Sequence, residues 1–237
     1  MGFHAYLQRQ DIAFESMWAA SANHKMFTRI KSEATRATQQ LAKERGECPD
    51  GKGYGVRNAH LLAVAPNASS SIICGNTSPS IEPYRANAFT QKTKSGSSLL
   101  KNEYLEHILQ EIGMDTDEVW KSIMTKGGSV QHLEFLDDHA KEVFKTGVEI
   151  DQRWVIQHAA DRQQYICQSQ SLNVFFPANV SKQELHAIHM MAWKKKVKTL
   201  YYLRSEAMKR AENVSDEALR KYITDSIDEN SCLACEG

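Results

Sequence analysis

The stretch from Ala59 to Ala65, AHLLAVA, is a nearly continuous apolar run that ends at Pro66. Such a run is typical of a strand buried on both faces, as in a parallel sheet covered by helices. Two further strand-like segments, residues 172–176 and 198–202, are rich in apolar and β-branched side chains. Because helical patterns separate these segments, the sequence predicts an α/β fold. The strands are few for a closed sheet in 237 residues, so either others escape the pattern or another chain completes the sheet.

Helical patterns account for much of the remaining chain. The first is Ala-rich and runs from about residue 21 to residue 45, with Gly46 at the expected C-cap position. Thr116 and Ser181 occupy N-cap positions of later helices, and Ser181 opens a capping-box pattern. Residues 75–98 are rich in Gly, Ser, Thr, Asn and Pro and are expected to be irregular. The later helices are expected at about 99–112, 116–126, 129–147, 151–168 and 181–196.

Composition narrows the functional classes. Hydrophobic residues make up 41% and charged residues 24%, which suits a globular protein of one or two domains. The 29 basic and 29 acidic residues give a net charge of +0, so no bulk field favours nucleic acid or an anionic membrane. No apolar run approaches the roughly 18 residues that span a bilayer, and the N-terminus lacks a secretory-signal pattern. Five cysteines, an odd number, argue against a secreted disulfide framework, so a cytoplasmic location is expected.

The residues after the apolar run, Pro66-Asn67-Ala68-Ser69-Ser70-Ser71, form a hydroxyl-rich turn. If a helix starts there, its N–H groups, its positive dipole end and the serine hydroxyls together form a cradle for an anion such as phosphate. The alternative is an ordinary Ser-rich N-cap, and the sequence leaves both interpretations open.

The third strand-like segment ends in two adjacent tyrosines, Tyr201 and Tyr202. Side chains alternate faces along a strand, so neighbouring tyrosines normally point to opposite sides. A stacked pair therefore needs a strand end or a bulge. Packing in the core is the alternative for this pair.

Cys232 and Cys235 form a CxxC pair close to the C-terminus. This spacing suits half of a zinc site or a redox dithiol, but a second CxxC or a nearby His pair, which zinc would need, is missing from the sequence. Two idle thiols are the third alternative.

Two further groups of polar and charged side chains are expected to lie on the protein surface without forming a metal or catalytic site. His186 and His189 could chelate a metal at i,i+3 spacing, but an exposed or partly buried helix face fits them better because no carboxylate or thiol partner is evident. A cluster on the helix at 151–168 is expected to be a solvated face with ion pairs; it consists of Asp151, Arg153, Asp161 and Arg162.

Several long motifs stand together in one order: MGFHAYLQ, ERGECPDGKGYGVRNAHLLAVAP with NASSS, IEPYRAN, DQRWVIQHAADRQQYICQSQSLNVFF, KKKVKTLYYLRS and the terminal cysteine pair. In this order they resemble the large, catalytic subunit of class I (aerobic) ribonucleoside-diphosphate reductase, of the bacterial and phage type. The resemblance is continuous from Gly2 to the tail and covers only the C-terminal third of such a subunit. It implies the C-terminal portion of a ten-stranded α/β barrel (residues 1–204), followed by a segment with a mobile redox tail (residues 205–237).

The resemblance also implies roles for individual residues. The loop of Asn67, Ala68, Ser69 and Ser70 would hold the substrate's diphosphate. Tyr201 and Tyr202 would relay a radical from the small subunit toward an active-site cysteine, with Tyr201 nearer the cysteine. Cys232 and Cys235 would re-reduce the active-site disulfide and be recharged by thioredoxin or glutaredoxin.

The same resemblance implies partners. The radical-forming cysteine and the two substrate-reducing cysteines lie upstream in the family, so reduction of ribonucleoside diphosphates would require an N-terminal piece of the large subunit. It would also require a small subunit, whose cofactor in the family is usually a di-iron tyrosyl radical; this chain itself is expected to bind no cofactor or metal. The location would be cytoplasmic, or the host cytoplasm if a phage encodes the chain. A subunit encoded in two parts, an inactive remnant and a non-enzymatic thiol redox or binding module remain alternatives.

Overall fold

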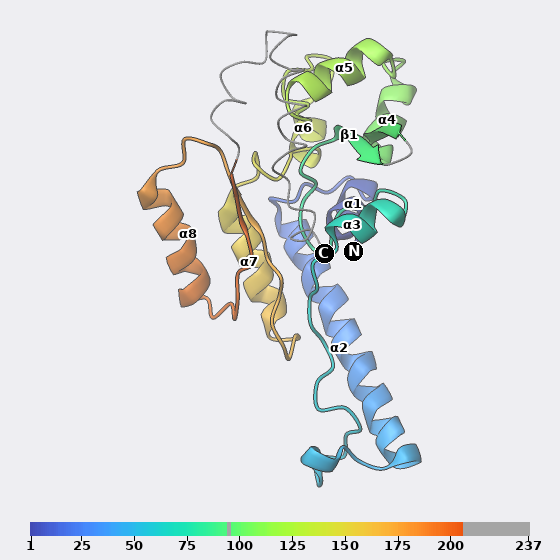
Figure 1. Cartoon of the computed structure of the whole chain (residues 1–237), viewed down its shortest axis with the longest axis vertical. Coiled ribbons are helices and arrows are strands. Elements are labelled where there is room, and N and C mark those ends of the chain that lie inside the picture. Colours follow the sequence, from blue (N-terminus) through green and yellow to red (C-terminus); the bar gives the residue numbers. More distant parts are fainter. Residues whose placement is uncertain (94–95, 206–237) are drawn as a thin grey trace.

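The computed structural model describes residues 1–93 and 96–205. Figure 1 shows a body of short helices from which one long helix, α2 (Met17–Arg45), projects. The remaining elements in chain order are α1 (Phe3–Arg9), η1 (Pro49–Gly51), α3 (Ala68–Ile73), β1 (Ala88–Thr93), β2 (Gly96–Lys101), α4 (Glu103–Glu111), α5 (Asp117–Thr125), α6 (Asp138–Val143), α7 (Gln152–Gln163), β3 (Val174–Phe176), α8 (Lys182–Lys194) and β4 (Leu203–Ser205).

Three extended segments form a parallel array, separate from the two-stranded sheet of β1 and β2. β3 pairs in parallel with β4, and an isolated parallel bridge joins Val64 to Gln170. The segment 168–176 lies in the middle. Its groups at 169 and 171 bond to Val64, whereas its groups at 172 and 174 bond to the tyrosine pair. Since successive backbone groups of a strand point to opposite edges, the two neighbours lie on opposite sides of this central segment.

The expectation that residues 59–65 are buried on both faces is wrong for this chain. Leu61, Leu62 and Val64 are half-buried, and the remaining residues of the run, among them Ala63 and Ala65, are exposed. Only one edge of the run pairs with a strand of the described part of the chain. Within the described residues, the second edge of this apolar run and its exposed side chains are therefore uncovered.

Most predicted helices are present, and their ends follow the capping residues. α2 begins earlier than predicted because the Ser16 hydroxyl accepts a hydrogen bond from Ala19 N–H at 3.1 Å. It ends at Gly46, whose φ of 81° lies in the left-handed region that glycine tolerates. Thr116 and Ser181 cap α5 and α8 as predicted.

Several predicted elements differ from the structure. The strand predicted at 198–202 is found instead at 203–205 (β4), and the helix predicted at 151–168 ends at Gln163 (α7). Residues 75–98 are predicted to be irregular, but β1 and β2 form an antiparallel hairpin, so the predicted helix start at 99 moves to 103. Within 129–147 only α6 is helical. Successive turns there bury Val130, Leu133 and Leu136, and this three-residue spacing imitates a helical pattern without helical hydrogen bonding.

The described residues contain two apolar cores, and α1 belongs to the first of them. The first packs α2, α7, α8 and β3 around Leu7 and Phe14, and the second packs α4, α5 and α6 behind β1. Polar side chains join them: Tyr84 N–H donates to His4 Nδ1 at 2.9 Å, and Asn102 Nδ2 donates to Gln8 Oε1 at 2.9 Å. In the described ranges, no helix combines the length and apolarity needed to cross a membrane.

The predicted solvated face of α7 is partly wrong. Arg153 pairs with Asp151 at 2.5 Å as expected, but Arg162 is fully buried. Its Nε donates to Gln170 Oε1 at 2.7 Å and its Nη1 to Asn23 Oδ1 at 3.2 Å. Burial lowers the pKa of Arg162 to about 9. Arg162 thus ties α2 and α7 to the central segment 168–176 through neutral amides, which satisfy its donors without a carboxylate.

We expect the free energy of unfolding to fall as the pH is lowered from about 6.5 toward 4. Burial lowers the pKa of His4 to about 3 and that of His158 to about 4, whereas both imidazoles bind a proton near pH 6.5 in the unfolded chain. Between these values only the unfolded state is protonated, and each histidine contributes a slope of about 1.4 kcal/mol per pH unit. Urea unfolding at a series of pH values, followed by tryptophan fluorescence, measures this dependence of the free energy of unfolding on pH.

His4→Asn and His158→Gln should each remove one histidine's contribution to this slope, about 1.4 kcal/mol per pH unit. Each amide keeps one hydrogen-bonding position of the imidazole but does not titrate. His186→Gln, at an exposed histidine of α8, is the matched control variant. A slope that neither buried variant alters would contradict the assignment.

Candidate functional site

The rings of Tyr201 and Tyr202 form a tilted stack immediately before β4. Their ring centroids lie 4.1 Å apart with planes tilted by 48°. Tyr201 is 47% exposed and Tyr202 is 36% exposed, so packing in the core is the wrong interpretation for this pair. The stacked arrangement is the one that needs a departure from regular strand geometry.

The hydrogen bonds show that departure. Val174 N–H donates to Tyr202 O at 3.0 Å, and Val174 lies opposite Leu203. Continued back regularly, this ladder would bring Tyr202 N–H to Leu172 O, but Tyr201 N–H occupies that acceptor at 2.8 Å. One extra residue is therefore inserted on the tyrosine side, which is a β-bulge. The bulge places two sequence neighbours on the same side of the strand.

Two further side chains, Asn173 of the central segment and Arg204 of β4, contact Tyr202. Tyr202 N–H, displaced from the ladder, donates to Asn173 Oδ1 at 3.0 Å. The guanidinium carbon of Arg204 lies 5.2 Å from the Tyr202 ring centroid, within the range of a cation–π contact. Sequence reasoning missed Asn173 and Arg204, because neither type of residue predicts such a contact without the register of the strands.

The serine-rich turn does begin a helix, as the anion-cradle interpretation requires. The first N–H to bond back into α3 is that of Ser71, which donates to Asn67 O at 3.0 Å, so the N–H groups ahead of it lie at the positive end of the helix. Ser69 and Ser70 are exposed on this turn. Ser71 instead is buried and donates to Ala68 O at 2.8 Å, so the third serine is structural.

The register brings the serine turn level with the tyrosine pair. Val64 lies opposite Gln170, so two residues further on Pro66 is level with Leu172, to which Tyr201 donates. The two groups flank the same central segment from opposite edges. Adjacent strands are about 4.8 Å apart, so the outer strands are separated by roughly 10 Å. Both candidate groups therefore lie at the same level of the sheet.

Cys167 lies beside the apolar run. Its Sγ accepts hydrogen bonds from the N–H groups of Leu61 and Leu62, both at 3.1 Å. Burial, which raises the pKa of the thiol, is outweighed by these N–H groups, so the pKa of Cys167 is lowered. No sequence pattern indicates this contact, which anchors the start of the run to the central segment.

The other candidates do not form a centre in the described residues. Cys232 and Cys235 lie outside them. His186 and His189 are exposed on α8, and no group of three or more His, Cys, Asp or Glu side chains suited to a metal occurs in residues 1–93 and 96–205.

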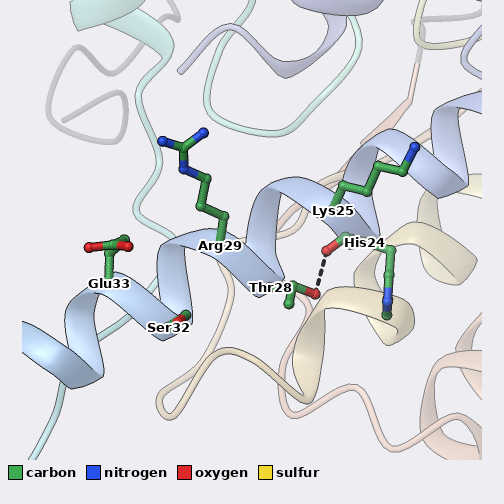
Figure 2. Close-up of a pocket in the computed structure, with 6 residues that line it drawn as sticks. All are labelled: His24, Lys25, Thr28, Arg29, Ser32 and Glu33. Atoms are coloured by element: carbon green, nitrogen blue, oxygen red, sulfur yellow. Dashed lines mark hydrogen bonds between the residues drawn. The ribbon is translucent and has the colours of Figure 1, made fainter.

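A shallow concavity on α2 is no stronger a candidate. Figure 2 shows that a single helix supplies its lining, so no groups converge on it from a second element; the residues are His24, Lys25, Thr28, Arg29, Ser32 and Glu33.

Comparison with known proteins gives one consistent result. The family described as "Ribonucleotide reductase, barrel domain" matches residues 49–203. The ribonucleoside-diphosphate reductase large subunit of Invertebrate iridescent virus 6 is 51% identical over 219 residues, covering 91% of this chain and 23% of that protein. The large subunit of Invertebrate iridescent virus 3 is 44% identical over 240 residues, covering 100% of this chain and 38% of that protein.

A solved structure agrees. The Actinobacillus ureae class Id ribonucleotide reductase alpha subunit matches with a TM-score of 0.81 and 43% sequence identity, over 89% of this chain and 38% of that one. The chain spans well under half the length of these relatives. The matched family region contains the serine turn, the central segment and the tyrosine pair.

Proposed function

The chain belongs to the ribonucleotide reductase large-subunit family, and we propose that it contributes to the reduction of ribonucleoside diphosphates to deoxyribonucleoside diphosphates. It contains part of the family's barrel domain. The reaction is an oxidoreduction by a radical mechanism, and the chain acts only together with the rest of the barrel. The observation that carries the proposal is the stacked, solvent-facing pair Tyr201–Tyr202 on its bulge.

In this proposal the tyrosines pass an oxidising equivalent inward. Tyr202 faces the small subunit and loses an electron and a proton to the radical that the subunit supplies. It regains both from Tyr201, which recovers them in turn from the active-site cysteine. The centroid separation of 4.1 Å supports direct exchange between the two phenols. Arg204 beside Tyr202 holds the outer ring in place.

The serine turn holds the diphosphate of the substrate. Backbone N–H groups at the start of α3 and the hydroxyls of Ser69 and Ser70 are donors of the type that binds phosphate oxygens. Asn67 and Ala68 form the approach to the turn, and Ala68 contributes through its backbone. The position of the turn level with the tyrosine pair supports a shared active site.

Other chains or segments complete the enzyme. The remaining strands of the barrel pair with the open edge of residues 61–65 and bring the active-site cysteines. A small subunit holding a di-iron tyrosyl radical supplies the oxidising equivalent. Cys232 and Cys235 return electrons to the active site and receive them from thioredoxin or glutaredoxin, in the cytoplasm.

The rival functions predict different chemistry. An inactive remnant or a thiol carrier would have no need of a bulge that stacks two tyrosines toward solvent. Mixing the chain with the rest of the barrel and the small subunit separates the three: an enzyme component restores nucleotide reduction, a remnant restores nothing, and a thiol carrier exchanges disulfides without it.

Tyr201→Phe and Tyr202→Phe should each abolish turnover in the reconstituted complex and leave assembly intact. Phenylalanine keeps the stacking surface but loses the oxidisable hydroxyl, at a stability cost of only about 1 kcal/mol. Deoxynucleotide formation and co-sedimentation measure the two effects. Tyr54→Phe, at a position 82% exposed on another loop, is the control. Near-parental rates in both dyad variants would rule out the relay.

Ser69→Ala combined with Ser70→Ala should raise KM for the nucleotide more than it lowers kcat. Each lost hydrogen bond to a charged phosphate costs roughly 1.5–3 kcal/mol, so KM should rise about tenfold or more. Ser32→Ala on the exposed face of α2 serves as the control. An unchanged KM with a lower melting temperature would identify the serines as an N-cap alone.

Cys232→Ser with Cys235→Ser should stop multiple turnover driven by thioredoxin or glutaredoxin. The first turnover of the pre-reduced complex should survive, because the substrate-reducing cysteines are elsewhere in the barrel. Dithiothreitol, which reaches the active site by diffusion, should restore part of the rate. Deoxynucleotide formed per complex, with thioredoxin as the sole reductant, is the assay. Cys74→Ser, at an exposed cysteine, is the control; a double variant that cycles at the parental rate would refute the role.

A further inference from the structure

The bulge at the tyrosine pair leaves a backbone donor to be satisfied. Because Tyr201 N–H has taken Leu172 O, Tyr202 N–H cannot donate to the carbonyl that a regular ladder would offer. A displaced N–H without a new acceptor destabilises the bulge relative to the regular register. Asn173 Oδ1 accepts it at 3.0 Å. The side chain of the central segment thus replaces the missing carbonyl.

A buried carboxylate fixes which way the Asn173 amide points. Glu82 Oε2 accepts from Asn173 Nδ2 at 3.0 Å, and Glu82 Oε1 accepts from the backbone N–H of Asn173 at 3.1 Å. Glu82 is 5% exposed and Asn173 is 6% exposed, so water cannot easily exchange with these bonds. With its NH2 group held by the carboxylate, Asn173 can present only its oxygen to Tyr202.

Burial and neighbouring groups act on the Glu82 carboxyl in opposite directions. Burial has the larger effect and raises its pKa, while the two hydrogen bonds from Asn173 and the positive charges of Arg204 and Arg162 offset only part of this shift. Arg204, whose charge acts on the Glu82 carboxyl, also lies over the Tyr202 ring. The hydrogen bonds through Asn173 link Glu82 to the backbone of Tyr202.

We propose that Glu82 and Asn173 are positioning residues for the radical relay, which stabilise the bulged register and so keep Tyr201 and Tyr202 stacked. Neither residue is oxidised or reduced. The proposal rests on the relay role proposed for the tyrosines, but the geometry it describes is measurable without turnover. In the regular register, neighbouring tyrosines would point to opposite faces, and the direct contact between the rings would be lost.

Glu82→Gln tests the orientation of the amide with almost no change in volume. The substituted side chain has one acceptor oxygen in place of two, so it cannot accept from both Asn173 donors, and its NH2 group opposes that of Asn173. We expect Asn173 to lose its fixed orientation and the rings to separate. In the reconstituted complex kcat should fall at least about tenfold, with KM for the nucleotide within about twofold of the parent.

The double variant Glu82→Gln with Asn173→Asp is the rescue. The amide oxygen introduced at position 82 can accept from the backbone N–H of residue 173, and the NH2 group beside it can donate to the new carboxylate. The second carboxylate oxygen can accept from Tyr202 N–H. Every hydrogen bond and the single negative charge are thereby retained with their positions exchanged. We expect most of the lost kcat to return. Glu111→Gln, on an exposed position, controls for loss of charge.

The second readout is the 19F NMR shift of 3-fluorotyrosine at position 202, measured in the reconstituted complex. It should move in Glu82→Gln and return in the double variant, since the neighbouring ring of Tyr201 sets the shift. The proposal is overturned if Glu82→Gln leaves both the shift and kcat unchanged, or if the double variant is as impaired as the single. If the parental complex forms no deoxynucleotide, the proposed function fails, while the shifts still decide the geometry.

Discussion

Parallel pairing of the central segment 168–176 with a neighbour on each edge is the interaction on which the rest of the structure depends. It brings the end of the apolar run at residues 61–65 and the start of β4 to the same level, although well over a hundred residues separate them in the chain. α7 supports this segment through buried Arg162, whose side chain bonds to Gln170 and to Asn23 of α2. The serine turn and the tyrosine pair owe their relative position to this array and not to contacts between themselves.

The same array leaves the outer edge of residues 61–65 without a paired strand in the described ranges. A strand with Leu61, Leu62 and Val64 is suited to burial on both faces, yet its outer edge has no strand beside it in the described ranges. The matched family is a barrel domain, and closure of a sheet into a barrel removes free edges of this kind. Cys167, which accepts from the N–H groups of Leu61 and Leu62, holds the inner side of this strand in register and leaves its other side for pairing.

Local chemistry made part of this architecture predictable. Thr116, Ser181 and Gly46 marked helix ends because capping is decided within a few residues. The hairpin of β1 and β2 could not be predicted, because its strands have the Ser, Thr and Gly content of a loop. The turns at Val130 and Leu133 were predicted as helix because their apolar residues have helical spacing. For the site, the sequence indicated the tyrosine pair and its need for a strand end or a bulge, and it left open whether a helix starts at the serine turn. Asn173 and Glu82 could not be predicted, since their roles depend on a register that only tertiary pairing sets.

The hydrogen-bonded side chains of Glu82 and Asn173 favour one strand register at a cost in fold stability. Burying a carboxylate and an amide carries a desolvation cost, and apolar side chains of similar volume would often stabilise a fold as well or better. Apolar residues at positions 82 and 173, however, would offer no acceptor to Tyr202 N–H, so the regular register would become the favoured one. The buried Glu82–Asn173 pair therefore favours one of two registers that differ by a single residue. Because the side-chain period of a strand is two, that single residue decides whether Tyr201 and Tyr202 face each other or opposite sides of the sheet.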